Sequence, residues 1–227
     1  MGKIEWPKFG FLGLLICLVS LLVVSPFLQE YSPAKPVVRI FSTAVILFSI
    51  YPFLKKKHAL IIYSLLAAPA FIFSWVSYSF QSPTILLIQY AFNANFFIFI
   101  IVSILSEIFR KNVITLDLIY GSICVYLLIG VAWAYIYAVL ENISPGSFNF
   151  PLPYLQANPS LIESGTPFSL LLYYSFVTLA TLGYGDITPA TPPAQSLAAL
   201  EAITGQFYLA ILVARLVGIY ISNKSKQ

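Results

Sequence analysis

Long apolar runs dominate this sequence, and they restrict the folds open to the chain more than any other feature. A helix needs about 20 largely apolar residues to cross the hydrocarbon core of a bilayer. Six segments meet that requirement: about 9–28, 37–54, 59–80, 84–107, 115–140 and 195–221. Charged residues make up 9% of the chain, whereas a soluble domain carries about 25%. The sequence therefore predicts an all-α membrane protein with six transmembrane helices.

The first run, about 9–28, also admits interpretation as a secretory signal peptide, because Lys3 and Lys8 precede it. The apolar part of a signal peptide spans about 7–15 residues and ends at a small-residue cleavage site. This run is longer and ends in SPFLQ. We therefore expect a span that is retained.

Basic residues predict which side of the membrane each loop faces, because cytoplasmic loops carry an excess of lysine and arginine. A cytoplasmic N-terminus places most of them inside: Lys3, Lys8, Lys55, Lys56, Lys57, Arg110, Lys111, Lys224 and Lys226. Both termini are then cytoplasmic, and the 141–166 connection is outside. The net charge of +4 thus reflects orientation in the cell (inner or plasma) membrane, and no nucleic-acid partner is expected.

A seventh apolar stretch, about 167–179, is too short to span and must end inside the membrane or turn back. Irregular backbone at that depth is tolerated only where protein buries it or where it lines a watery cavity. In the TLATLGYGDITP stretch that follows (178–189), glycines at alternate positions can take positive φ. Successive carbonyl oxygens would then face one side. One such strand cannot surround an ion, so the sequence predicts a homotetrameric pore.

The hexapeptide TLGYGD (181–186) resembles the TVGYGD selectivity filter of potassium channels, in the same setting of helix, re-entrant helix, filter and helix. Known filters contain four TVGYG loops whose carbonyl oxygens replace the hydration shell of K⁺. The resemblance implies K⁺ sites and a filter at Thr181, Leu182, Gly183, Tyr184 and Gly185, with Asp186 at the outer mouth. A simple turn between two helices is the alternative interpretation of GYGD alone.

The same resemblance implies roles for residues around the filter. Tyr173 and Tyr174 stand where relatives carry aromatic residues that brace the filter, and Gly205 matches the glycine about which the inner helix bends. Glu201 lies within the last predicted span, where a carboxyl group is costly and usually has a partner. We expect it to donate or accept a hydrogen bond that supports the filter or the re-entrant helix. A neutral glutamate buried in ordinary packing is the alternative.

Helical periodicity places five residues on one stripe of the last span, which the resemblance assigns to the cavity and gate: Gln206, Leu209, Ala210, Val213 and Val217. Gln206 would form a polar ring below the filter. The valines would form an apolar constriction that gates by dewetting. Arg215 lies on another face, where we expect it to contact lipid headgroups.

Six spans with the pore in the last two resemble the plan of voltage-gated channels, but the fourth span, about 84–107, contains no basic residue before Arg110. We therefore divide the chain into a four-helix, degenerate voltage-sensor-like domain (1–112) and a pore domain (113–227). Because the link between them is short, we expect both to pack within one subunit. Gln89 and Asn93 share a helix face and should hold membrane helices together, although a hidden ligand or ion site among the four helices is an alternative.

The sequence thus predicts a tetrameric K⁺-selective channel that is not voltage-gated, with K⁺ as the conducted ion. Alternatives are a weakly selective cation channel and a secondary transporter with a broken helix. An enzyme is not expected, because no nucleophile, base or metal set converges and the chain has one histidine. Anionic lipid is a possible partner of Lys55, Lys56 and Lys57, and no cytosolic ligand domain is expected.

Overall fold

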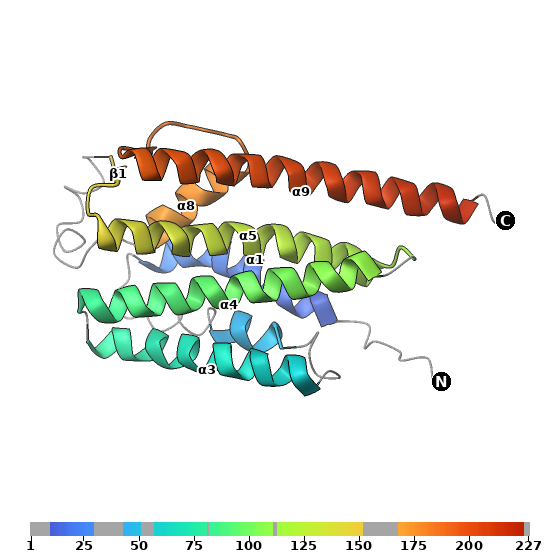
Figure 1. Cartoon of the computed structure of the whole chain (residues 1–227), viewed down its shortest axis with the longest axis horizontal. Helices are drawn as coiled ribbons and strands as arrows, with labels where there is room; N and C mark the ends of the chain where they lie inside the picture. Colours follow the sequence, from blue (N-terminus) through green and yellow to red (C-terminus); the bar gives the residue numbers. More distant parts are fainter. Residues whose placement is uncertain are drawn as a thin grey trace. The chain divides into compact units, whose positions relative to one another are not determined.

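The computed structural model describes residues 10–29, 43–50, 57–80, 82–110, 113–151 and 168–224, and these are mostly helical. The elements in chain order are α1 (Gly10–Gln29), α3 (Lys57–Ser79), α4 (Pro83–Arg110), α5 (Leu116–Ile143), β1 (Phe148–Asn149), α8 (Phe168–Leu179), β2 (Thr188–Pro189) and α9 (Pro192–Lys224) (Figure 1). Residues 43–48 are also helical.

Four helices of the described part of the chain are long and apolar enough to cross a membrane: Leu60–Ser77, Pro83–Arg110, Leu116–Ile143 and Pro192–Ile219. They coincide with four of the predicted spans. Shorter apolar helices cover Phe11–Val24 and Phe168–Leu179. The second predicted span, 37–54, lies largely outside the described residues, so the number of six stays a prediction.

The last helix begins earlier than the sequence predicted. Pro192 and Pro193 were expected to precede it, yet both lie in the first turn of α9. Proline is favoured there, because its missing N–H belongs to the group of amides that has no partner inside the helix, and its fixed φ suits helical geometry. Helix α9 therefore begins before the predicted span of about 195–221.

The described chain falls into two compact units, which we describe separately. The first contains α1, the N-terminal parts of α3 and α5, the C-terminal part of α4, and α9 from Leu212 onward. The second contains the remaining parts of α3, α4 and α5, together with β1, α8, β2 and α9 up to Ile211. All residues of the TLGYGD segment lie in the second unit.

In the first unit, α1 packs on the N-terminal half of α5. The Phe11 backbone N–H donates to Asp117 Oδ1 at 3.4 Å. A Cβ placed on Gly121 would lie 3.2 Å from the Phe11 ring. The small residue on α5 therefore accommodates the aromatic ring at the start of α1.

In the second unit, an aromatic cluster joins α4, α5 and α8. The ring centres of Tyr135 and Phe168 are 4.3 Å apart, and Phe97 and Tyr90 stack on them at 5.6 Å and 6.1 Å respectively. Helix α4 therefore contacts α5 and α8 in this unit, and packing of the first four spans on their own subunit's pore stays a prediction.

Helices α3 and α4 are joined in the second unit by a polar contact. The buried Asn93 side chain donates to the Ser74 hydroxyl at 3.3 Å and to the Gln89 carbonyl at 2.9 Å. Asn93 thus links two apolar helices, which is the role that its residue type predicted. Gln89 takes part through its backbone.

Candidate functional site

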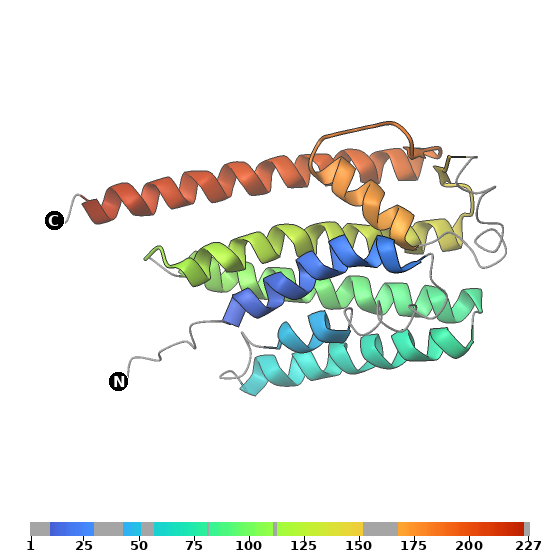
Figure 2. The same ribbon diagram turned by 180° about the vertical axis from the view of Figure 1, so that it is seen from behind.

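Two glycines allow α8 to approach α5 and α9 closely (Figures 1 and 2). A Cβ placed on Gly130 of α5 would lie 2.7 Å from the Phe176 ring. A Cβ placed on Gly205 of α9 would lie 2.4 Å from the Leu179 carbonyl oxygen. A larger residue at 205 would push α8 away from α9, whereas at 130 the Phe176 ring would have to shift.

Gly205 was predicted to be a hinge. In the structure α9 runs through it as one helix, and the residue serves as a packing position against the C-terminal end of α8. Because the contact is with a backbone carbonyl, it cannot be relieved by moving a side chain. The hinge role stays a prediction about motion.

A buried polar cluster lies where the three helices meet. Glu201 of α9 has no exposed surface. The Tyr137 hydroxyl of α5 donates to Glu201 Oε2. Glu201 Oε1 lies 2.5 Å from Ser175 Oγ of α8, which in turn lies 2.7 Å from the Gly130 carbonyl oxygen. The carboxyl group therefore contacts the helix that it was expected to brace.

Helix α8 ends in a tight turn that leads into the TLGYGD segment. The Thr181 N–H donates to the Thr178 carbonyl at 3.0 Å, and the Leu182 N–H donates to the Val177 carbonyl at 2.9 Å. These bonds satisfy carbonyls that the end of a helix would otherwise leave unpaired. The start of the segment is thereby fixed to the last turn of α8.

Alternate residues of this segment have left-handed backbone conformations. The φ angles are 57° at Thr181, 59° at Gly183 and 77° at Gly185. Glycine adopts such angles without a steric penalty, and the sequence predicted the alternation for both glycines. It did not predict a positive φ at Thr181, where an L-residue is strained. Strain of this kind persists only where the surroundings impose it, and it gathers at functional sites.

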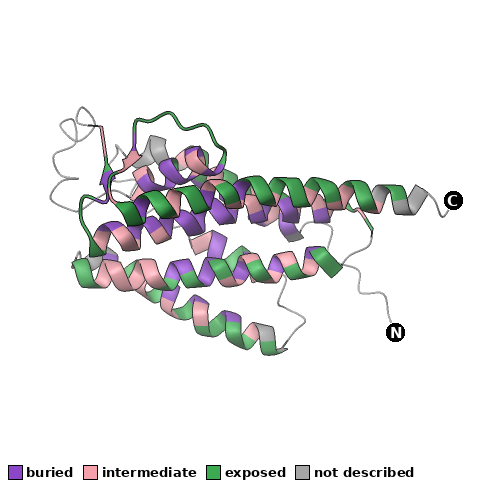
Figure 3. Cartoon of the chain, turned by 45° about the horizontal axis from the view of Figure 1, so that its top comes forward, coloured by how far each residue is buried: buried purple, intermediate pink, exposed green. Residues whose placement is uncertain are grey.

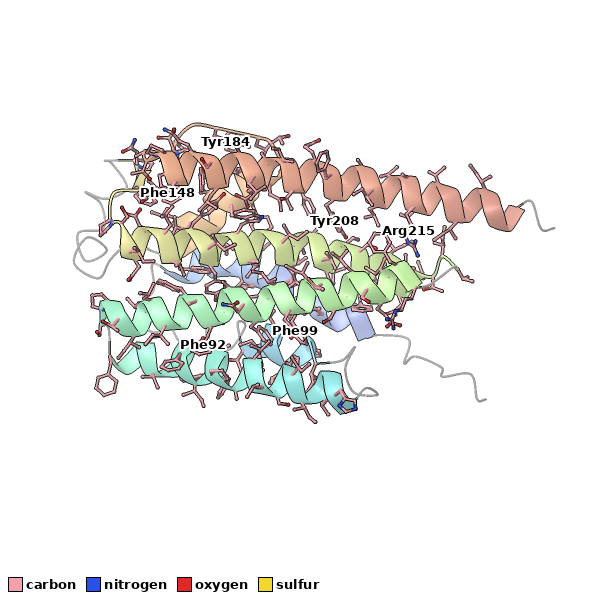
Figure 4. The ribbon with its side chains drawn as sticks, viewed as in Figure 1. Phe92, Phe99, Phe148, Tyr184, Tyr208 and Arg215 are labelled. Atoms are coloured by element: carbon pink, nitrogen blue, oxygen red, sulfur yellow. The ribbon has the colours of Figure 1, made fainter. Side chains whose placement is uncertain are left out.

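The segment is uncovered within the single chain. Leu182 is 57% exposed and Tyr184 is 67% exposed, and Tyr184 lies in the loop that connects α8 to β2 (Figure 4). All residues from Ala180 to Asp186 are likewise exposed (Figure 3). Its groups therefore remain available to an ion, to solvent or to another subunit.

Asp186 has two partners. The Tyr173 hydroxyl donates to Oδ2 at 2.7 Å, and the Ile187 N–H donates to Oδ1 at 3.0 Å. The hydroxyl bond ties the end of the TLGYGD segment back to α8. The backbone bond is local, because its donor is the next residue in the chain.

Beyond Asp186 the chain is held by a short antiparallel ribbon. Strand β1 pairs with β2 in the register Phe148↔Pro189 and Asn149↔Thr188. The Ala190 N–H donates to the Ser147 carbonyl at 2.8 Å. The return from the TLGYGD segment is thus anchored to the turn that follows α5.

That turn is organised by Glu141 near the end of α5. Its two carboxyl oxygens accept the N–H groups of Gly146 at 2.9 Å and Phe148 at 3.2 Å. Phe148 then packs edge-on against the rings of Tyr137 and Tyr174, with centroid distances of 5.2 Å to each. Tyr174 is therefore buried in an aromatic group behind the segment, whereas Tyr173 contacts Asp186.

The predicted cavity stripe of α9 is exposed in the single chain: Gln206, Leu209, Ala210, Val213 and Val217. The buried residues among the described side chains of α9 are Ala194, Glu201 and Gly205, which share one face. Figure 3 shows how much of α9 remains exposed. Gln206 Nε2 donates to Thr181 Oγ1 at 3.4 Å, so this stripe begins beside the first residue of the segment.

Arg215 is placed differently from our expectation. Its Nη2 atom donates to the carbonyls of Ile108 at 3.0 Å and Phe109 at 2.7 Å, and the guanidinium lies 4.8 Å from the centre of the Phe109 ring (Figure 4). The last carbonyls of α4 lack partners inside the helix, and a cation is favourable at that negative end. These carbonyl contacts were not predicted from the sequence, and contact of Arg215 with lipid headgroups stays a prediction.

The side chains of the three predicted lipid-binding lysines are not described by the structure. Lys55 and Lys56 lie outside the described residues, and the side chain of Lys57 is likewise not described. An anionic-lipid site at these positions stays a prediction.

Sequence reasoning missed three residues of the buried cluster: Gly130, Tyr137 and Ser175. Gly130 and Tyr137 lie in an apolar helix, where nothing distinguishes them from ordinary packing residues. Ser175 offered one signal, because it is a hydroxyl within the short apolar stretch and needs a partner when buried. The partner itself becomes apparent only when the three helices are assembled.

Comparison with known proteins gives two matches. Residues 121–222 match the family described as "Ion channel". A stretch of 51 residues is 43% identical to "Two pore potassium channel c" of Oryza sativa subsp. japonica. This stretch covers 22% of the chain and 11% of that relative, so the chain matches only a small part of its length. These matches, with the apolar helices, support an ion channel domain in a multi-pass membrane protein.

Proposed function

We propose that the chain forms a tetrameric, K⁺-selective channel that conducts K⁺ passively and is not voltage-gated. The observation that carries this proposal is the alternating left-handed backbone at Thr181, Gly183 and Gly185 in an exposed segment that directly follows a short helix. Such alternation turns successive carbonyls to one side. The residues that would ligate K⁺ are Thr181, Leu182, Gly183 and Tyr184, with Gly185 completing the filter.

The backbone geometry explains the proposed selectivity. Carbonyl oxygens replace the hydration shell of K⁺ in filters of this type. Because the ligands are backbone atoms, the exchange of valine for Leu182 keeps the ligand set. The Thr181 hydroxyl supplies a further oxygen at the inner end, where it accepts from Gln206.

Four copies are proposed because one chain presents oxygens from one side only. The exposed Leu182 and Tyr184 side chains and the exposed stripe of α9 provide apolar surface for neighbouring subunits and for the cavity. The C-terminal end of α8 adds a partial negative charge of about half an elementary charge. That charge favours a cation beside Thr181.

The proposal excludes steep voltage gating on the basis of charge. Each elementary charge that crosses the field contributes about 2.3 kcal/mol per 100 mV. Helix α4 carries one basic residue, Arg110, in its last turn, and its buried polar residue Asn93 is engaged with Ser74. With so little charge inside the span, voltage cannot perform the work that a sensor needs.

The proposed orientation places both termini in the cytoplasm and Asp186 at the outer mouth. There the carboxyl group would concentrate cations while it remains bonded to Tyr173. Glu201, Tyr173 and Tyr174 would support the filter. Gln206, Leu209, Ala210, Val213 and Val217 would line the cavity and gate, with Gly205 packed against the C-terminal end of α8.

The deciding experiment measures reversal potentials for purified full-length protein in liposomes, in K⁺ against Na⁺, over a series of voltages. We expect strong preference for K⁺ and little dependence of open probability on voltage. Gly183→Ala should abolish selectivity, since its φ of 59° disfavours an L-residue although no atom lies within 4 Å of the added Cβ. Gly218→Ala, also with open space around its Cβ, is the matched control.

Each alternative has its own outcome in this experiment. A permeability ratio near one would replace the proposal with a weakly selective cation channel. Uptake against a gradient that is driven by a second ion would replace it with a secondary transporter. Steep voltage dependence would contradict the assignment of α4.

A further inference from the structure

In the buried cluster around Glu201, the oxygen–oxygen contacts outnumber the hydrogens that the two hydroxyl groups carry. Three oxygen–oxygen contacts form a chain: Tyr137 to Glu201 Oε2, Glu201 Oε1 to Ser175, and Ser175 to the Gly130 carbonyl. Each contact needs one hydrogen. Tyr137 and Ser175 contribute one each, and a carbonyl contributes none. The third hydrogen must therefore be carried by the carboxyl group.

An ionised carboxylate would fit this place poorly. With only two hydrogens, either the Ser175–Glu201 contact or the Ser175–Gly130 contact would join two acceptors. Within the described residues, the polar atoms in contact with the carboxyl group are hydroxyls, which carry no positive charge. The other titratable group nearby is Tyr174 of α8, whose ring packs against Tyr137. A charge buried without a compensating partner is strongly unfavourable.

We propose that Glu201 is held as a neutral carboxylic acid and donates its proton to Ser175, and that this bond positions α8. The hydrogen bonds then run in one direction, from Tyr137 through Glu201 and Ser175 to the Gly130 carbonyl. Every hydroxyl donates once. One proton thereby connects α5, α8 and α9, and α8 leads directly into the TLGYGD segment.

The functional consequence rests on the proposed channel. Val177 and Thr178, within one turn of Ser175, accept the N–H groups that fix Leu182 and Thr181. A shift of α8 would therefore be transmitted to the first two ligating residues. Glu201 acts through α8 and does not touch the ion, so it is a positioning residue.

The test of the proton is spectroscopic and does not depend on conduction. Infrared difference spectra between the full-length protein and Glu201→Gln, both in liposomes, should show the carbonyl stretch of a protonated carboxylic acid at neutral pH. The same band should persist but shift in frequency in Tyr137→Phe and in Ser175→Ala, since each removes one hydrogen bond. A difference spectrum that contains only carboxylate bands would overturn the proposal.

The test of positioning compares two variants of similar size. Glu201→Gln retains an N–H donor and a C=O acceptor, so its K⁺/Na⁺ permeability ratio should stay close to that of the parent. Glu201→Leu removes both and should reduce the ratio about tenfold, the change that about 1.4 kcal/mol of lost hydrogen bonding produces. Equal losses in both variants would contradict positioning by a neutral donor.

The infrared measurement and the permeability measurement distinguish failure of the proposed function from failure of the inference about the proton. If the protein does not conduct K⁺ selectively, the proposed function fails, but the infrared result still decides whether Glu201 carries a proton. If the protein is selective and the spectrum shows a carboxylate, only the inference about the proton fails. Should Glu201→Leu not assemble, Ser175→Ala provides the second measurement of the ratio, and an unchanged value there would contradict the positioning role.

Discussion

Gly205 is a single residue whose small size lets α9 pack against the end of α8, directly before the proposed filter. Adding one methyl group there would place it 2.4 Å from the Leu179 carbonyl oxygen. We expect Gly205→Ala to destabilise the assembled protein by about 1–3 kcal/mol, the usual cost of overpacking. The gain in helix propensity of about 1 kcal/mol offsets part of this loss. The measurement is the temperature at which the proposed tetramer dissociates in detergent.

Gly218→Ala is the control for this prediction, because the same substitution on the same helix meets no atom within 4 Å. Its dissociation temperature should stay equal or rise slightly. If Gly205 served only as a hinge, Gly205→Ala would alter open probability and leave the dissociation temperature unchanged. That outcome would contradict the packing role.

Other single residues show where sequence reasoning stops. The alternating glycines at 183 and 185 indicated the backbone geometry, because the lack of a Cβ is a local property. The positive φ of Thr181 was not indicated, because threonine has no local preference for it and the surrounding contacts must impose it. Ser175 and Tyr137 were missed for a similar reason, since their roles depend on where Glu201 lies in space.

At the scale of elements, the apolar runs predicted the positions of α3, α4, α5 and α9 well, because length and hydrophobicity alone determine which segments suit a bilayer. The predicted ends of these helices were less accurate. Helix α9 begins at Pro192 and α5 continues to Ile143, since proline in a first turn and capping contacts near Glu141 move a boundary without changing hydrophobicity.

At the scale of elements, we predict that Arg215 stabilises the C-terminal end of α4. Arg215 donates to the carbonyls of Ile108 and Phe109, so Arg215→Gln should weaken this end by about 1 kcal/mol. The expected result is faster amide hydrogen exchange in the last turn of α4 and around residue 215 of α9. Arg110→Gln, at the same helix end but exposed, is the matched control and should change exchange less.

A different result would instead support contact between Arg215 and lipid headgroups. If Arg215→Gln reduced binding to vesicles that contain anionic lipid and left amide exchange unchanged, the guanidinium would act on headgroups. In that case the carbonyl contacts would contribute nothing to the stability of α4.

At the scale of the whole molecule, the conducted ion should stabilise the assembly that binds it. A single chain leaves Leu182 and Tyr184 exposed, so K⁺ sites of the proposed kind would exist only in the proposed tetramer. A ligand that binds only the assembled state stabilises it, and each tenfold rise in ligand above its dissociation constant adds about 1.4 kcal/mol per site. The temperature of dissociation should therefore rise with K⁺ concentration.

The measurement compares K⁺, Na⁺ and a large organic cation at equal ionic strength, because general screening acts equally in all three. K⁺ should raise the dissociation temperature most, and Gly183→Ala should remove the difference by disturbing the ligating backbone. Gly218→Ala should retain it. Because the Glu201 cluster fixes the helix that precedes Thr181, Glu201→Leu should also reduce the K⁺ effect while Glu201→Gln preserves it. Identical temperatures in the three cations would show that the assembly contains no selective K⁺ site, whatever its subunit number.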